Sequence, residues 1–194
     1  MGNEINIEHK YFKGDSKKVN FLFEPYVREI EYRYEWASKS FVSIGDAINN
    51  QEGAIEIIRH AVDLIGHAVV IHRIVTGSGA RPHERERVEE RVKILRDKFK
   101  NLKDIKTPKN LNVVRNHYEH FDAKLDEWAT STENNIIVDM NVASPGSIYI
   151  EGIAEKENLR SLDPETTELL LWSKKVNLRE VIEWAKEVKD AVSN

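Results

Sequence analysis

The 194-residue sequence contains no cysteine. A disulfide framework, a thiolate-ligated metal centre and a cysteine nucleophile are therefore excluded. No apolar run approaches the length of a membrane span, so no association with a membrane is expected. The first twenty residues are polar and lack the apolar stretch of a secretory signal. These absences favour a cytoplasmic protein.

Glycine is also scarce, with only 9 residues, and the usual glycine-rich phosphate-binding motifs are missing. Gly77-Ser78-Gly79 lacks the third glycine of a dinucleotide-binding turn and does not follow a predicted strand. There is no Gly-x-Ser-x-Gly nucleophile elbow. No cofactor is therefore predicted.

The formal net charge is −4, which argues against a general nucleic-acid coat protein. The charge is uneven, because residues 81–109 hold eleven lysines and arginines against six acidic residues. One interpretation is a solvated helix laced with ion pairs. The other is a basic rim that steers a polyanion toward a nearby site.

Apolar residues at three- and four-residue steps predict a helix from Phe23 to about Ile48, with Pro25 in its first turn. A second helix, over 52–75, is apolar on nearly every side, which is typical of a central or partner-covered helix. A third helix opens at Pro82. The fourth begins at Thr107-Pro108, with threonine as the N-cap, and runs past residue 128 as one amphipathic helix.

After residue 132 the pattern changes. Residues 136–142 and 148–150 predict a β-hairpin around a Ser-Pro-Gly-Ser turn, and 169–172 predict a third strand. A last helix begins at Asn177, with Glu180 three residues later as in a capping box. We therefore expect a mainly α fold of four to five bundled helices with a small C-terminal antiparallel hairpin. The chain divides into an arm (1–18), a helical bundle (19–132), and a hairpin with a last helix in the same domain (133–194).

The strongest chemical signal lies on the fourth predicted helix, where the chain reads Arg-Asn-His-Tyr-Glu-His from Arg115 to His120. Arginine grips a phosphate with two parallel hydrogen bonds, and histidine transfers protons near neutral pH. On an ideal helix, His120 lies roughly 130° from the centre of the apolar stripe and one turn after Asn116. His120 is therefore expected to face solvent, another part of the fold or a second subunit. The plain alternative is that Arg115 pairs with Glu119 or Asp122 and that the histidines are ordinary surface residues.

This segment resembles the Arg-four-to-six-residues-His signature of the HEPN superfamily, in which a polar residue such as Asn116 often follows the arginine. The resemblance covers about ten residues closely, and the helices over 20–130 suit the compact bundle of that superfamily. Many HEPN proteins are metal-independent ribonucleases in which two copies of the motif meet across a homodimer. By that resemblance His120 would be the general base or acid at the ribose 2′-hydroxyl. Arg115 would stabilise the charge on the phosphate, and Asn116 would orient His120 or the phosphate.

The other residues of the motif, His117, Tyr118 and Glu119, would support this site. The resemblance further implies RNA as substrate, a 2′,3′-cyclic phosphate product, a homodimer and a nucleotidyltransferase-type antitoxin as a partner. Other HEPN members are inactive binding or dimerisation modules, which is the first alternative function.

A second alternative is a metal-dependent helical bundle that uses His60, His67 and His72 on the second predicted helix. Metal sites in bundles usually draw ligands from several helices, so packed or surface histidines are the simpler interpretation and no metal is predicted. A run of aromatic residues on the first predicted helix is interpreted as core and interface rather than as an RNA-stacking platform. It comprises Tyr26, Tyr32, Tyr34, Trp36 and Phe41.

Overall fold

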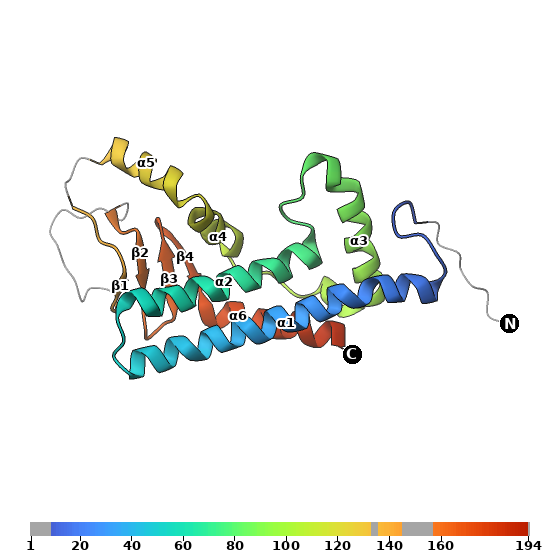
Figure 1. The fold of residues 1–194 in the computed structure, drawn as a ribbon, viewed down its shortest axis with the longest axis horizontal. Helices are drawn as coiled ribbons and strands as arrows, with labels where there is room; N and C mark the ends of the chain where they lie inside the picture. The colour runs from blue at the N-terminus through green and yellow to red at the C-terminus, as the bar shows by residue number, and fades with distance from the viewer. Residues whose placement is uncertain (1–8, 133–135, 145–156, 194) are drawn as a thin grey trace.

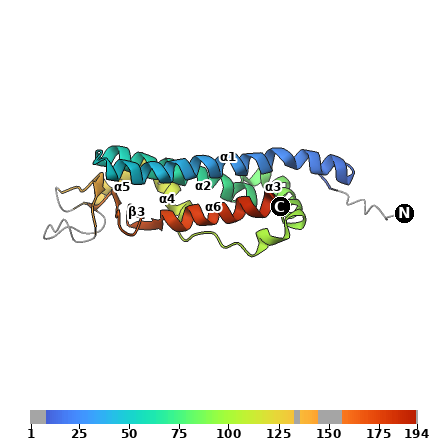
Figure 2. The same cartoon turned by 90° about the horizontal axis from the view of Figure 1, so that it is seen from below.

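The computed structural model describes residues 9–132, 136–144 and 157–193. Two long helices, α1 (Ser16–Asn49) and α2 (Ala54–Thr76), run antiparallel along the length of the molecule, and the C-terminal helix α6 (Leu178–Ser193) lies beside them (Figures 1 and 2). The remaining helices are α3 (Arg85–Lys98), α4 (Leu111–Glu119) and α5 (Phe121–Ser131). The 3-10 turns η1 (Pro82–Glu84) and η2 (Lys100–Lys103) flank α3. The predicted mainly α class is confirmed.

Helix α1 begins earlier than its apolar pattern indicates. The Asp15 carboxylate caps the helix by accepting a hydrogen bond from the Lys18 amide at 2.8 Å, so the first turn starts at Ser16. Pro25 therefore lies in the helix interior, and its predicted place in the first turn was wrong. Proline there has no N–H to donate to the carbonyl of Phe21, a residue that lies at the exposed surface of the helix.

Helix α2 forms the centre of the core, as its nearly continuous apolar sequence predicts. Helices α1, α3, α4 and α6 all pack against it. Its buried side chains include Ile58, Leu64 and Ile71. It ends at Gly77, whose left-handed backbone (φ 76°) caps the helix at the predicted glycine-containing break. Among the helices in the described ranges, none combines the length and apolar character that a membrane crossing requires.

The predicted fourth helix is broken into two. Thr107-Pro108 does not start it, since α4 begins at Leu111 after Asn110, which has a positive φ of 64°. The helix ends at Glu119, and His120 (φ −110°, ψ 41°) joins it to α5. The break lets Phe121 leave the line of α4, and its ring contacts that of Trp172 at a centroid distance of 5.4 Å.

The small sheet is mixed. Within the described residues its strand order is β1 (Asn141–Val142), β2 (Arg160–Leu162), β3 (Glu168–Leu171) and β4 (Lys174–Asn177). Strand β1 pairs with β2 in parallel, whereas β2–β3 and β3–β4 are antiparallel. Both β2–β3 and β3–β4 are therefore antiparallel hairpins, and β3 confirms the predicted strand at 169–172. Of the predicted strand at 136–142, Asn141–Val142 forms β1, which pairs with β2 in parallel. The predicted strand at 148–150 lies outside the described residues.

Helix α6 begins where the sequence predicts. The Glu180 amide donates to the Asn177 side-chain oxygen at 3.1 Å, which is the N-cap contact. Val181, Ala185 and Val188 are buried and fasten α6 to the α1–α2 pair.

Candidate functional site

Helix α4 carries the motif and lies against the middle of the molecule. Leu111 and Val114 are fully buried and hold α4 onto α2 and the sheet. The next residue, Arg115, is partly buried, whereas Asn116, Tyr118 and His120 are exposed. Thus the motif lies at the surface of a well-anchored helix, and its side chains diverge around the helix axis.

Arg115 lines a cleft of 340 Å³ between α1, α2 and α4. Two more arginines line the same cleft, Arg33 from α1 and Arg73 from α2. Tyr118 and Glu119 from the motif also face it, together with His67. Arginines from three helices therefore line one cleft, a composition suited to a phosphate or another anion.

The Arg115 guanidinium forms an ion pair with Glu119 one turn later and donates to the Asn116 side-chain oxygen at 3.3 Å. The predicted alternative pairing of Arg115 with Glu119 is therefore present. Partial burial, and then the nearby charge of Arg73, lower the pKa of Arg115 below its ordinary value.

His117 lies on a different side of α4. Its Nδ1 atom lies 3.4 Å from the carbonyl oxygen of Leu171 on β3, which can accept its hydrogen bond. His117 lines a separate pocket of 230 Å³ with Trp128, Trp172 and Lys124. Burial is the main cause that lowers its pKa. His117 and Arg115 therefore do not face a common ligand within one chain.

His120 occupies the junction of α4 and α5. Its amide donates to the carbonyl of Asn116 at 3.0 Å, and its carbonyl accepts from the Lys124 amide at 3.1 Å. Within the described residues, no hydrogen bond or ion pair engages its imidazole, and His120 does not line the arginine cleft. Its exposed side chain does not face the core, as predicted.

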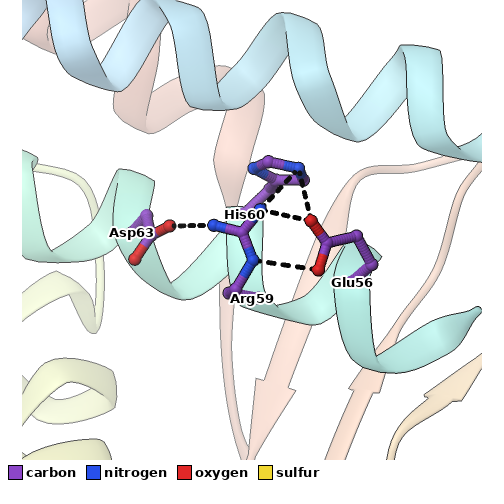
Figure 3. A network of polar contacts seen from close by, with 4 residues as sticks. All are labelled: Glu56, Arg59, His60 and Asp63. Carbon is purple, nitrogen blue, oxygen red and sulfur yellow. Dashed lines mark hydrogen bonds and ion pairs between the residues drawn. The ribbon is translucent and has the colours of Figure 1, made fainter.

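The three histidines of α2 have three different environments. His60 contacts Glu56 and Arg59 (Figure 3), and His67 accepts from the Arg33 Nη1 atom at 3.2 Å. His72 is buried, and its Nδ1 atom lies 3.1 Å from the Asn112 side-chain nitrogen. Over the described ranges, no group of three or more histidine or acidic side chains is arranged to hold a metal ion.

The basic segment 81–109 forms a different surface from the motif. Its helix α3 lines a groove of 590 Å³ with the end of α2. The charged residues of that groove are Arg85, Glu89, Lys93, Arg96, Asp97 and Lys103. Arg115 does not line it, and the two carboxylates offset part of its positive charge.

Sequence reasoning missed Arg33 and Arg73, because neither belongs to a motif and both come from helices distant in sequence from α4. The one available signal was spacing on α2, where Gly66, Val69, Val70 and Arg73 recur on the cleft side. Comparison with protein-family models, with curated proteins and with solved structures finds no match to this chain.

Proposed function

We propose that this chain is a metal-independent endoribonuclease of the HEPN type, active as a homodimer in the cytoplasm. Arg115 holds the scissile phosphate, His120 transfers protons, and Asn116 orients His120 or the phosphate. The observation that supports this most directly is the position of Arg115, the arginine of the motif, in a cleft that two further arginines line. Such a cleft complements the charge that grows on phosphate oxygens during cleavage.

The reaction requires one proton to leave the ribose and one to reach the leaving group. In the proposed step a neutral His120 takes the proton of the 2′-hydroxyl, whose oxygen attacks phosphorus. The bond from phosphorus to the 5′ oxygen breaks, and a protonated second histidine donates a proton to that oxygen. The products are a 2′,3′-cyclic phosphate and a 5′-hydroxyl. One protomer has a single His120, and it lies outside the cleft lining, so the second histidine is assigned to a second copy of the chain.

A non-catalytic RNA-binding module is the second candidate. Glu119 already neutralises part of the Arg115 charge, and His120 does not line the cleft. A protein of this kind would bind the RNA backbone through the arginines and would leave the strand intact. A nucleotidyltransferase-type antitoxin remains a proposed partner of the ribonuclease only.

RNA cleavage in EDTA separates the two candidates. We expect the wild-type protein to generate 2′,3′-cyclic phosphate ends, and the His120→Ala protein to lose about a hundredfold in rate or more. His83→Ala is the matched control, because His83 is an exposed histidine beside α3. Full cleavage by the His120→Ala protein would rule out the proposed mechanism. RNA binding by a wild-type protein that never cuts would favour the binding module.

A further inference from the structure

An exposed aromatic pair adjoins the arginine cleft. Tyr32 and Trp36, one turn apart on α1, are 49% and 42% exposed. Their rings are stacked, with centroids 6.2 Å apart and an interplanar angle of 21°. Phe41 and Tyr34, from the same aromatic run, are partly buried against the core instead. Core packing, one part of the core-and-interface interpretation of this run, therefore does not account for the exposed pair.

Trp36 is linked directly to the cleft. The Arg33 guanidinium lies 5.2 Å from the centre of its indole ring, and the ring of His67 lies 5.4 Å away. Both of these neighbours line the cleft. A ligand that fills the cleft can therefore extend across Arg33 onto the exposed indole.

Of the three arginines that line the cleft, one has no counterion among the residues that the structure describes. Arg33 bonds Glu29 at 2.7 Å, and Arg115 pairs with Glu119. For Arg73, by contrast, no hydrogen bond or ion pair of its guanidinium is found within the described residues, although it is partly buried.

Among the described residues that line the cleft, Asp63 is the carboxylate besides Glu119, and it already has a partner. Asp63 accepts from Arg59 at 3.0 Å in a network that also includes Glu56 (Figure 3). A partly buried charge without a partner costs free energy unless a ligand supplies the opposite charge. Arg73 therefore indicates that an anion binds in the cleft.

We propose that the cleft and the aromatic pair together bind single-stranded RNA, with a backbone phosphate between Arg73 and Arg115 and an unpaired base on Trp36. This inference rests on the proposed function, since it assigns the substrate class and the specificity-determining residues of the same site. A positively charged groove beside an aromatic face is the arrangement that binds single strands without base-specific contacts. A duplex keeps its bases stacked on one another and offers none to Trp36.

Fluorescence anisotropy with a labelled, unstructured RNA of about ten nucleotides tests the proposal, since such lengths span a single-strand site. The Trp36→Ala change should weaken binding about five- to a hundredfold, the range found for lost base stacking. Phe21→Ala is its control, because Phe21 is the more exposed aromatic at 69% and lies outside the cleft lining on the same helix. Equal affinity of the Trp36→Ala and wild-type proteins would overturn the stacking assignment.

The Arg73→Gln change tests the phosphate assignment. It should lower the dependence of log affinity on log salt concentration by about 0.7, the value for one lost phosphate contact on a single strand. Arg28→Gln is the control, since Arg28 is exposed on α1 and pairs with Glu24. An unchanged salt slope, or equal affinity for a duplex of the same length, would overturn the proposal. Circular dichroism melting of every variant confirms that it is folded.

The two proposals fail in different ways. Single-strand binding that depends on Trp36 and Arg73, without any cleavage, supports this inference and removes the ribonuclease. Cleavage that depends on His120 but tolerates both changes supports the ribonuclease and removes the inference.

Discussion

Arg115 has two neighbours with opposite effects on an anion. Glu119 holds its guanidinium on one side, while Arg73 lies close enough to disfavour its charged form. An incoming phosphate relieves the repulsion between the two arginines and competes with Glu119 for hydrogen bonds. The planar fork of Arg115 can bind Glu119 and a phosphate at once, whereas a lysine ammonium cannot reproduce this geometry.

Arg115→Lys should therefore lose about tenfold or more of the cleavage rate, although the charge is kept, because a charge-assisted hydrogen bond is lost. Steady-state cleavage of a short labelled RNA measures the effect. Arg87→Lys is the matched control, because Arg87 is exposed and pairs with Glu84 on the surface of α3. Equal rates for Arg115→Lys and the wild type would mean that Arg115 acts only as a point charge.

His72 makes stability depend on pH. Burial, and then the adjacent Arg73 charge, hold its pKa below the ordinary value, while the Asn112 contact acts in the opposite direction. The unfolded chain takes up a proton at this histidine as the pH falls below about 6.5, and the folded protein resists it. The unfolded state then binds more protons, so the free energy of unfolding decreases as the pH falls through this range.

Urea unfolding at several pH values between about 7.5 and 5.5 checks this sign. His72→Gln should reduce the slope without abolishing it, because burial also lowers the pKa values of His67 and His117. His83→Gln is the control substitution, because His83 is an exposed histidine. A wild-type protein that becomes more stable on acidification would contradict the assignment.

The turn between α2 and α3 depends on Gly77. It has a φ of 76°, and an added Cβ would lie 2.6 Å from the Val88 Cγ1 atom on α3. Gly77→Ala should therefore destabilise the protein by about 1–3 kcal/mol through backbone strain and the displacement of α3. Gly45→Ala is the control in the opposite direction. Gly45 is helical with open space around it, so alanine there should stabilise by about 0.5–1 kcal/mol. Relative to the wild type, the thermal unfolding midpoint should be lower for Gly77→Ala and higher for Gly45→Ala.

Local patterns predicted the elements whose ends are determined by nearby residues. The Asn177 cap starts α6, and Gly77 ends α2, and both signals are readable in the sequence. The break at His120 has no such signal, because a continuous apolar stripe favours one helix there. Phe121, the first residue after the break, contacts Trp172 in the turn between β3 and β4, and such a tertiary contact is invisible to periodicity.

Strand β4 was missed for a similar reason. The two-residue turn before it, Trp172-Ser173, has positive φ at both positions (50° and 63°). A tight hairpin of this kind usually carries asparagine or glycine, and neither is present. Strand β4 itself reads Lys-Lys-Val-Asn, which lacks the β-branched run of a strand. Its pairing is imposed by β3, whose leucines are buried against the helices.

The candidate site was predictable only in part. The motif identified Arg115 because one helix carries both the arginine and its neighbours. The cleft also contains Arg33 and Arg73, from α1 and α2, and Trp36 lies beside Arg33. Only the packing of three helices brings these residues near Arg115. A pattern along one helix contains no information about that packing.

At the scale of the whole molecule, the apolar character of α2 is satisfied within one protomer. Helices α1, α4 and α6 pack against it, and most of its apolar side chains between Ile57 and Val75 are buried. This helix therefore gives no reason for a partner subunit, although its composition suggested one. The remaining argument for a homodimer is chemical, because the proposed proton transfer uses two His120 side chains and each chain has one.

The homodimer stays a prediction, and the absence of cysteine makes it directly testable. We expect light scattering at micromolar concentration to give about twice the monomer mass of 22.5 kDa. The His120→Cys protein has a single thiol, and two such thiols that meet across the dimer axis should form a disulfide under mild oxidation or react with a short bis-maleimide. His83→Cys is the control, since its surface thiol lies away from the proposed contact. The His83→Cys protein should therefore run as a monomer on a denaturing gel. Efficient cross-linking at His83 but not at His120 would place any dimer contact elsewhere. It would also leave His120 without the second histidine that the proposed proton transfer requires.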